Sequence, residues 1–401
     1  MQRYTLVNMA TGRRTGSWLI NGAILGGSLT VAMLLAEIVL RVIGFSDPVF
    51  WTYDDVTGSK LYAGAQGWYR AEGEAFITIN NEGLRDREHS KAKPPNTVRI
   101  AVLGDSMVEA LQMPLENTFW AVFERLLKNC RTFGGGDVEV INFGAAGYGT
   151  AQELLTFRRR AASYSPDITI LAFYAGNDVR NNSKELELSK LRPFFSIQNG
   201  DLILDDSFLG NPEYQSFKSQ FDVRKRFFGL RTYQLMRKLK SVSEQWRAAG
   251  QRGTAQNANI EPGLDDHVFL APTIQAWKDA WQITERLILA LRDEVVARGG
   301  RFLVVSIPIG IQVHPIPEVR NRFMRELRID DLWYPETRLR ELGHREKLDV
   351  MTLSPTLQSH AESNQQYLHG FKNTRLGTGH LNYNGHKLLG EAIANHLCRS
   401  Q

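Results

Sequence analysis

Four short apolar runs, separated by amphipathic segments, constrain the fold of this chain more than any other feature. The runs are rich in β-branched residues and cover 98–104, 138–144, 168–176 and 301–308. Runs of this kind fill parallel sheets that are buried on both faces. The segments between them place apolar residues on one helical face, as the stretch from Phe119 to Leu127 does. We therefore predict a three-layer α/β/α domain built on a parallel sheet.

The N-terminal part of the chain contains a long apolar segment. No charged residue occurs from Thr15 to Ala36, and only Glu37 and Arg41 interrupt the apolar residues that follow. A stretch of this length can cross a hydrocarbon core of about 30 Å as one helix. We therefore predict a single transmembrane helix, with a cleaved signal peptide and a buried soluble helix as the alternatives.

The charges on either side of this segment predict its orientation. Arginines precede it and aspartates follow it, at positions Arg3, Arg13, Arg14, Asp47, Asp54 and Asp55. The positive-inside rule then leaves the N-terminus in the cytoplasm and exports the rest of the chain. We expect a single-pass membrane protein whose folded domain is extracytoplasmic, or periplasmic if the source is bacterial.

We divide the chain into three parts. Residues 1–45 form the cytoplasmic N-terminus and the transmembrane anchor, and residues 46–96 form an extracytoplasmic irregular segment that ends in a linker. Residues 97–401 form the α/β domain. Within it, an insertion at about 181–270 is too long for a simple loop, so we expect it to carry its own helices.

Basic and aromatic residues alternate within this insertion, between Val223 and Lys240, without a single acidic residue. The ordinary interpretation is a helix that packs its apolar stripe on the domain and leaves a basic face in water. Two further interpretations are a surface that rests on anionic lipid headgroups and a lid that binds an anionic polymer.

Composition and cysteine count narrow the possible partners and compartments. Of the 401 residues, 43% are hydrophobic and 23% are charged, as in folded domains. The net charge of +5 is moderately basic, but zinc-finger spacing, an aromatic RNA-binding signature and a basic tail are missing, so we expect no nucleic-acid partner. Cys130 and Cys398 permit one disulfide in an oxidising compartment or two separate buried thiols. The oligomeric state is not indicated.

Chemically useful residues follow the first three predicted strands. Ser106 follows the first strand, Gly147 the second and Asn177 the third. Because the carboxyl ends of parallel strands share one sheet edge, where α/β folds place their sites, we expect the three to converge. A serine hydroxyl can act as a nucleophile, and the N–H groups of Ser106 and Gly147 with the Asn177 amide can stabilise an oxyanion.

A base is needed to take the proton of the serine, and His380 is the best-placed histidine. It lies on a glycine-flanked loop just before a C-terminal amphipathic helix. We expect His386 and His396, on or beside that helix, to be ordinary surface residues. The structural alternatives are that Ser106 only caps a helix, and that Gly147, Asn177 and His380 only shape their loops.

Residues 97–397, apart from the insertion, resemble the SGNH (GDSL-type) hydrolases. The chain has GDS at 104–106, a glycine-rich block around Gly147, GND at 176–178 and a histidine before the last helix, in the order of that family. The resemblance implies a flavodoxin-like sheet and a serine esterase or acyl-transfer activity without metal or cofactor. It assigns Ser106 as the nucleophile, His380 as the base, and Ser106, Gly147 and Asn177 as the oxyanion hole.

The chain departs from the family pattern at the acid. The family usually has an aspartate two or three residues before the histidine, where this chain has Thr378 and Gly377. Either a backbone carbonyl near Leu376 orients the imidazole and leaves a Ser–His dyad, or an acid arrives from elsewhere in the chain. Met107 and Ala175 are milder departures from the same pattern.

These features predict a membrane-anchored extracytoplasmic serine esterase that removes short acyl groups, such as acetyl, from a glycan. The alternatives are a lipase or lysophospholipase, a glycan O-acyltransferase, and a catalytically weak glycan-binding module. The expected partners are an acylated glycan or lipid substrate and the membrane.

Overall fold

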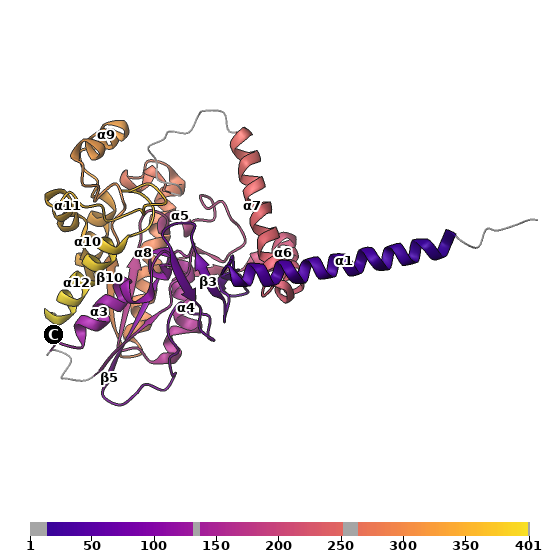
Figure 1. The fold of residues 1–401 in the computed structure, drawn as a ribbon. Helices are drawn as coiled ribbons and strands as arrows, with labels where there is room; N and C mark the ends of the chain where they lie inside the picture. The colour runs from indigo at the N-terminus through magenta and orange to yellow at the C-terminus, as the bar shows by residue number, and fades with distance from the viewer. Residues whose placement is uncertain (1–13, 131–136, 252–263, 400–401) are drawn as a thin grey trace, which may run out of the picture. The chain divides into compact units, whose positions relative to one another are not determined.

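The computed structural model describes residues 14–130, 137–251 and 264–399 (Figure 1). Contacts divide the chain into two compact units: Met1–Pro48 with Arg224–Thr254, and Val49–Val223 with Ala255–Gln401. Arg3 and Arg13, which support the predicted orientation, lie outside the described residues, and so does part of the predicted insertion, residues 252–263.

A parallel sheet of five strands forms the centre of the larger unit. Its order is β11–β10–β7–β5–β6, and all neighbouring strands are parallel. The strands are β5 (Thr97–Gly104), β6 (Asp137–Asn142), β7 (Ile168–Phe173), β10 (Arg301–Ser306) and β11 (Asp349–Thr352). Counted along the chain within this sheet, the order is 2-1-3-4-5, which is the flavodoxin-like arrangement. The four predicted strands and the predicted sheet type are confirmed.

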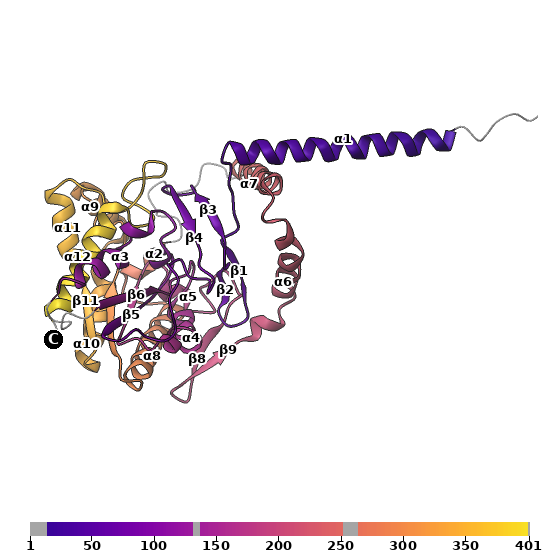
Figure 2. The ribbon, with the colours of Figure 1, turned by 60° about the horizontal axis from the view of Figure 1, so that its bottom comes forward.

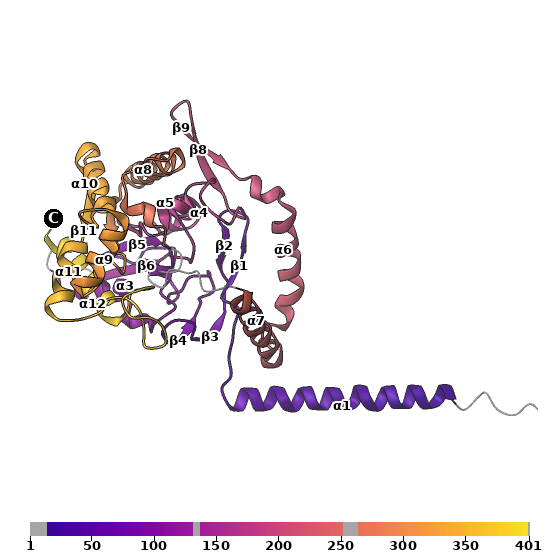
Figure 3. The same cartoon turned by 90° about the horizontal axis from the view of Figure 1, so that it is seen from above.

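Helices cover both faces of this sheet (Figure 3). On one face α3 (Phe119–Leu127) packs against α12 (Tyr383–Arg399), and on the other α4 (Thr150–Arg159) packs against α8 (Gln275–Val296). The apolar face predicted for α3 is the one that packs inward, since Phe119, Phe123 and Leu127 are fully buried. The predicted three-layer α/β/α fold is therefore confirmed.

The remaining helices of this unit connect the strands. They are α2 (Ser106–Glu109), α5 (Asp178–Asn181), α9 (Pro317–Leu327), α10 (Tyr334–Glu346) and α11 (Ser354–Ser363). Short 3-10 turns occur at Leu115–Asn117, Ala161–Tyr164, Ser207–Gly210 and Asp266–Phe269.

The segment before β5 is more ordered than we predicted from the sequence (Figure 2). It forms two antiparallel hairpins, β1 (Trp51–Asp54) with β2 (Gly58–Leu61) and β3 (Gln66–Tyr69) with β4 (Ala75–Thr78). The prediction of an irregular segment is therefore wrong here. The hairpins enclose a small apolar cluster of their own around Phe50, Leu61 and Ile77, but strands of four residues are too short for hydrophobic periodicity to reveal.

The predicted insertion contains helices, as expected, and also a hairpin that we did not predict. The hairpin consists of β8 (Phe194–Gln198) and β9 (Asp201–Asp205), and α6 (Pro212–Arg224) follows it. After the turn Lys225–Phe227, α7 (Arg231–Gln251) belongs to the smaller unit together with α1 (Arg14–Val42). The stretch Trp18–Val42 of α1 has a mean hydropathy of 2.1 and is long and apolar enough to cross a membrane.

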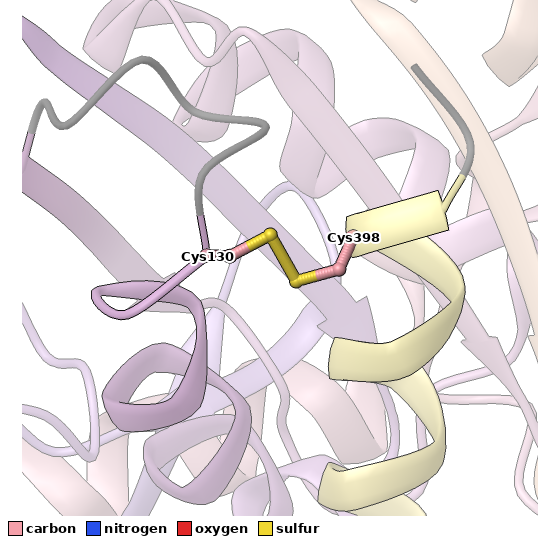
Figure 4. The surroundings of a disulfide bond; sticks show 2 residues. All are labelled: Cys130 and Cys398. Atoms are coloured by element: carbon pink, nitrogen blue, oxygen red, sulfur yellow. A yellow bond between two sulfur atoms is a disulfide. The ribbon is translucent and has the colours of Figure 1, made fainter.

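The two cysteines form a disulfide (Figure 4). Cys130 follows α3, Cys398 lies near the end of α12, and their Cα atoms are 6.0 Å apart. Of the two alternatives left open by the sequence, the structure has the paired one. The bond joins two helices that already pack against each other on one face of the sheet.

Candidate active site

The serine of the GDS block begins a short helix directly after β5. Asp105 caps this helix, α2, by accepting a hydrogen bond of 2.9 Å from the Met107 N–H. The alternative that Ser106 serves only as the cap is therefore wrong, because the preceding aspartate fills that place. Ser106 itself is half-buried, so it is neither sealed in the core nor fully exposed.

The position of this helix in the sheet is one where α/β folds bind ligands. β5 and β7 are neighbours, and the chain continues from them to opposite edges of the sheet, to β6 on one side and to β10 on the other. A crevice forms at such a point, outside the carboxyl ends of the strands. Ser106 follows β5 and Asn177 lies four residues after β7, so both residues lie at this crevice.

Asn177 is bonded to the GDS block. Its Nδ2 donates a hydrogen bond of 2.8 Å to Asp105 Oδ2. An amide nitrogen carries two hydrogens, so this bond orients the side chain while the second N–H can serve another acceptor. Asp105 therefore has two structural tasks: it caps α2 and it positions the amide that we expect in the oxyanion hole.

Gly147 lies in the loop after β6, in a backbone conformation that favours glycine, with φ at +76°. Its carbonyl accepts hydrogen bonds from Asn181 Nδ2 at 3.2 Å and from Arg192 Nη2. The preceding residue, Ala146, donates its N–H to the carboxylate of Glu109 at the end of α2. The glycine-rich block is thus fixed and tied to the helix of Ser106, as a preorganised oxyanion donor requires.

The fourth block, around His380, lies on a loop whose two ends are paired. His369 and Leu381 form an antiparallel bridge, and the Gly370 N–H donates to the His380 carbonyl at 2.9 Å. The charges of Asp105 and Glu109, on either side of Ser106, act on the imidazole of His380. The loop of His380 is therefore held in place, and its imidazole lies within the electrostatic reach of the carboxyl groups that flank Ser106.

The acid that the local sequence lacks is Glu72. Its Oε2 accepts a hydrogen bond from His380 Nδ1, and its Oε1 accepts one of 2.9 Å from the His380 backbone N–H. Both oxygens of one carboxylate are thus used to hold the histidine. Of the two alternatives left open by the sequence, the structure has an acid from elsewhere in the chain, so a dyad supported by a carbonyl near Leu376 is not needed.

Glu72 lies in the turn of the β3–β4 hairpin, which is clamped to the loop of His380. The Gly73 N–H donates to Asn373 Oδ1 at 2.9 Å, and Asn373 Nδ2 donates back to the Gly73 carbonyl at 2.9 Å. At Gly379, where φ is +78°, a Cβ atom would come within 2.4 Å of Glu72 Oε1. The close approach of the carboxylate therefore depends on glycine beside the histidine.

These contacts determine the proton positions on the imidazole. A carboxylate at Nδ1 accepts the proton there, so the neutral ring has Nε2 free to accept a proton from a serine. Burial by itself would lower the pKa of His380, but the hydrogen bond and charge of Glu72 outweigh it and raise that pKa. Burial would raise the pKa of Glu72, but its bonds to His380 lower it.

Two further carboxyl groups lie beside the nucleophile and are fully buried. Burial raises the pKa of Asp105, against the hydrogen bonds from Met107 and Asn177. Burial raises the pKa of Glu109 to about 7, although a bond of 2.7 Å from Trp51 Nε1 and the charge of His380 oppose the rise. Where Asp105 and Glu109 are ionised, they favour a positive charge on the imidazole.

The two histidines of the last helix differ from our expectation. His386 is fully buried, stacks on the ring of Phe119 and accepts a hydrogen bond of 3.1 Å from the Phe119 N–H. Burial lowers its pKa to about 3, so it stays neutral and structural. His396 is half-buried beside Asp349. The prediction of surface positions is wrong for His386, because the helix turns this face toward α3.

Among residues 14–130, 137–251 and 264–399, no three His, Cys, Asp or Glu side chains lie together in a way that could hold a metal ion. The chemistry described above uses only side chains and backbone N–H groups.

Comparisons with known proteins give structural matches only. No protein-family model matches the sequence, and no curated protein matches it. An acetyl xylan esterase, AlAXEase, is 14% identical, with a TM-score of 0.38, over 75% of this chain and 100% of its own. A lipolytic protein of the G-D-S-L family from Desulfitobacterium hafniense DCB-2 is 11% identical, with a TM-score of 0.33, over 74% and 98%. A catalytic mutant of Axe2, an acetylxylan esterase from Geobacillus stearothermophilus, is 10% identical, with a TM-score of 0.37, over 75% and 94%.

The fold and the candidate site can be compared with the resemblance stated from the sequence. The sheet is parallel with the flavodoxin-like order, and the four blocks that resemble the SGNH hydrolases lie at the ends of the strands or just before the last helix. The chain therefore resembles the SGNH hydrolases in its sheet order and in the order of its blocks. It departs from the usual pattern because the carboxylate that contacts the histidine comes from a hairpin that precedes the sheet.

Proposed function

We propose that this protein is a serine esterase in which Ser106 is the nucleophile, His380 the base and Glu72 the acid. The observation that carries the proposal is the contact of Glu72 with His380: one carboxylate holds both the ring and the backbone of the histidine. An oriented imidazole of raised basicity is what a serine hydroxyl needs to become a nucleophile at neutral pH.

The first half of the reaction forms an acyl-enzyme. Ser106 Oγ attacks the ester carbonyl carbon while His380 Nε2 takes the hydroxyl proton. The carbonyl oxygen becomes negative and accepts hydrogen bonds from the N–H groups of Ser106 and Gly147 and from the Asn177 amide. The bond to the alcohol oxygen then breaks, and His380 gives its proton to the departing oxygen.

The second half releases the acyl group. Water loses a proton to His380 and attacks the acyl carbonyl, the bond to Ser106 breaks, and the proton returns to the serine oxygen. In a transferase, a sugar hydroxyl would take the place of water. Glu72 stabilises the imidazolium that exists in both halves.

We propose a short acyl group on a glycan as the substrate and an extracytoplasmic, membrane-anchored domain as the location. Support comes from the family resemblance and from the apolar helix α1 with arginines before it and aspartates beyond it. A lipid ester is the second candidate, favoured by exposed apolar residues of the insertion, such as Phe217, Phe227 and Leu230, and by the basic residues between Val223 and Lys240.

Labelling with a fluorophosphonate tests the nucleophile. The full chain in detergent micelles should gain one adduct, located on Ser106 by peptide mass spectrometry. The adduct should be absent in Ser106→Ala, and labelling of His380→Ala should be slower by at least a hundredfold. Ser216→Ala removes an exposed serine on α6 and serves as the matched control, so it should label like the parent. A folded protein that takes no adduct would be a binding module rather than an esterase.

The same samples separate the substrate classes. Release of acetate from acetylated xylan, without turnover of lysophosphatidylglycerol, would support the glycan substrate. The reverse result would support the lipid candidate and overturn the glycan part of the proposal, while leaving the nucleophile assignment intact.

Replacing Gly379 by alanine should displace the acid. The new Cβ would lie 2.4 Å from Glu72 Oε1, so the carboxylate must move away from His380. We expect kcat/KM for p-nitrophenyl acetate to fall about 100-fold, the size that a displacement of about 1 Å can cause. Alanine at the positive φ of this position should also lower the free energy of unfolding by about 1 kcal/mol.

Gly377→Ala is the matched control for this change. It imposes the same backbone strain, with φ at +86°, but its Cβ would meet His314 instead of Glu72. Thermal unfolding should show a comparable loss of stability in both variants, with the larger loss of kcat/KM only in Gly379→Ala. Equal losses of activity would contradict a specific role of the contact with Glu72.

A further inference from the structure

The smaller unit joins the apolar helix α1 to α7 through a set of polar contacts at one end of each helix. The Glu37 carboxylate accepts hydrogen bonds from the Arg231 N–H at 3.0 Å and the Thr232 N–H at 2.9 Å, so it caps the beginning of α7. Arg41 Nη2 donates to the Gly229 carbonyl at 2.9 Å and pairs with Glu37. The start of α7 is therefore held at the level of these two charged residues of α1.

That level corresponds to the edge of a bilayer. The stretch from Trp18 to Ala36 has no charge, and at about 1.5 Å per residue it covers about 27 Å, close to the thickness of the hydrocarbon core. Glu37 and Arg41 then lie at the headgroup region, where charged side chains are well solvated. Since the first residues of α7 are bonded to Glu37, α7 begins in the same region.

The direction of α7 relative to α1 keeps the whole helix near the headgroup region. In Figures 1 and 3, α7 runs across the direction of α1 rather than alongside it. The chain after α1 is fastened to α7 as well, because the Asp47 carboxylate lies 3.7 Å from both Arg237 and Lys238 and the Asp47 N–H donates to Gln234 Oε1 at 2.9 Å. If α1 crosses a bilayer, α7 extends along its surface.

The exposed side chains of α7 suit that position. Met236, Leu239 and Trp246 are 56%, 61% and 78% exposed, and their spacing places them on one helical face. Lys240 and Arg247 lie next to that face by the same periodicity, and both are exposed. An apolar face with tryptophan, flanked by basic residues, is typical of helices that lie in the membrane interface. Of the three interpretations of this basic and aromatic stretch, the exposed apolar residues favour the surface that rests on anionic lipid headgroups.

We propose that α7 lies in the headgroup layer of the membrane that α1 spans, with Met236, Leu239 and Trp246 inserted toward the acyl chains. Lys240 and Arg247 face anionic phospholipid headgroups. This inference rests on the membrane anchor proposed above and is independent of the esterase activity. Charge complementarity and continuity with α1 select anionic lipid as the occupant of this face.

Fluorescence quenching in vesicles tests the proposal on the full chain. The native cysteines are paired, so single cysteines introduced by Trp246→Cys, Glu244→Cys and Leu29→Cys can carry an NBD label. The vesicles contain phosphatidylcholine and phosphatidylglycerol at 3:1, with doxyl-labelled lipid as the quencher. Glu244 is the matched control, since it lies two residues from Trp246 on the same helix but on another face.

We expect the labels at positions 246 and 29 to be quenched by the doxyl lipid, and the label at 244 to be quenched by iodide from the water instead. Quenching at 246 should weaken at least twofold in vesicles of pure phosphatidylcholine. It should also weaken in a chain that carries Lys240→Gln and Arg247→Gln.

Other patterns of quenching would overturn different parts of the proposal. Quenching at position 29 but not at 246 would overturn the placement of α7 and keep the anchor. No quenching at position 29 would overturn the anchor, and the proposal with it. Equal quenching at 246 with neutral and anionic vesicles would overturn the recognition of anionic lipid. Hydrolysis of p-nitrophenyl acetate by the same samples reports separately on the proposed esterase.

Discussion

Replacing Ser106 by alanine is expected to lower kcat/KM for ester hydrolysis by about 10⁴- to 10⁶-fold. The chemical step loses its nucleophile, and no other group described at the site can form the acyl-enzyme. The fold should be unaffected, because the cap of α2 is Asp105 and not Ser106. Steady-state hydrolysis of p-nitrophenyl acetate measures the loss, and circular dichroism with thermal unfolding checks the fold.

The double variant Ser106→Ala with His380→Ala makes this test more specific. Nucleophile and base act as one unit, so removing both should cost little more than removing Ser106 alone. Independent, multiplying losses would show that the histidine does not act through the serine. Loss of activity with early thermal unfolding would mean that the substitution damages the fold, and it would count against the role of Asp105 as the cap.

Replacing Glu72 by glutamine is expected to lower kcat about 10³- to 10⁴-fold. Glutamine keeps the size of the side chain but removes the charge that stabilises the imidazolium. It can also present an N–H to Nδ1 and stabilise the wrong tautomer of His380. Glu74→Gln is the matched control, since Glu74 lies in the same turn, is exposed and pairs with Arg70; its activity should remain near that of the parent.

The pH profile of the Glu72 variant separates an electrostatic role from a purely structural one. A base must be neutral to accept a proton, and Glu72 raises the pKa of His380 above its ordinary value of 6.5. In the parent, activity should therefore rise with pH through an apparent pKa above 6.5. Without the negative charge that pKa falls, so the remaining activity of Glu72→Gln should persist to lower pH. An unshifted profile would show that Glu72 only supports the loop.

Long apolar runs allowed most of the sheet to be predicted, whereas contacts between distant segments did not appear in any local pattern. The four apolar runs could be recognised because their strands are buried on both faces, as Ile100 and Ile170 are, so nearly every residue in them is apolar. β11 was missed because its four residues at the sheet edge are only half-buried, so they carry no clear apolar signal. His386 was misplaced because helical periodicity alone does not say which face α3 covers.

The residues of the candidate site also fall into those that a local pattern reveals and one that depends on a distant contact. Ser106, Gly147 and Asn177 could be found because each follows a strand, and His380 because it precedes the last helix. Glu72 could not, since its partner lies 308 residues away along the chain. The strands on either side of it, β3 and β4, have four residues each, which is too short for hydrophobic periodicity to reveal. Nothing in that stretch indicates what the hairpin touches.

The origin of the acid changes what counts as the smallest working piece of this protein. A chain shortened to begin at Thr97 would keep the whole parallel sheet and four of the five residues discussed above, yet it would have lost the fifth with the β3–β4 hairpin. We therefore expect that substitutions confined to the stretch between the anchor and the sheet can abolish the proposed esterase activity while all four sequence blocks remain unchanged. The region with the faintest sequence pattern thus supplies the carboxylate that holds the histidine.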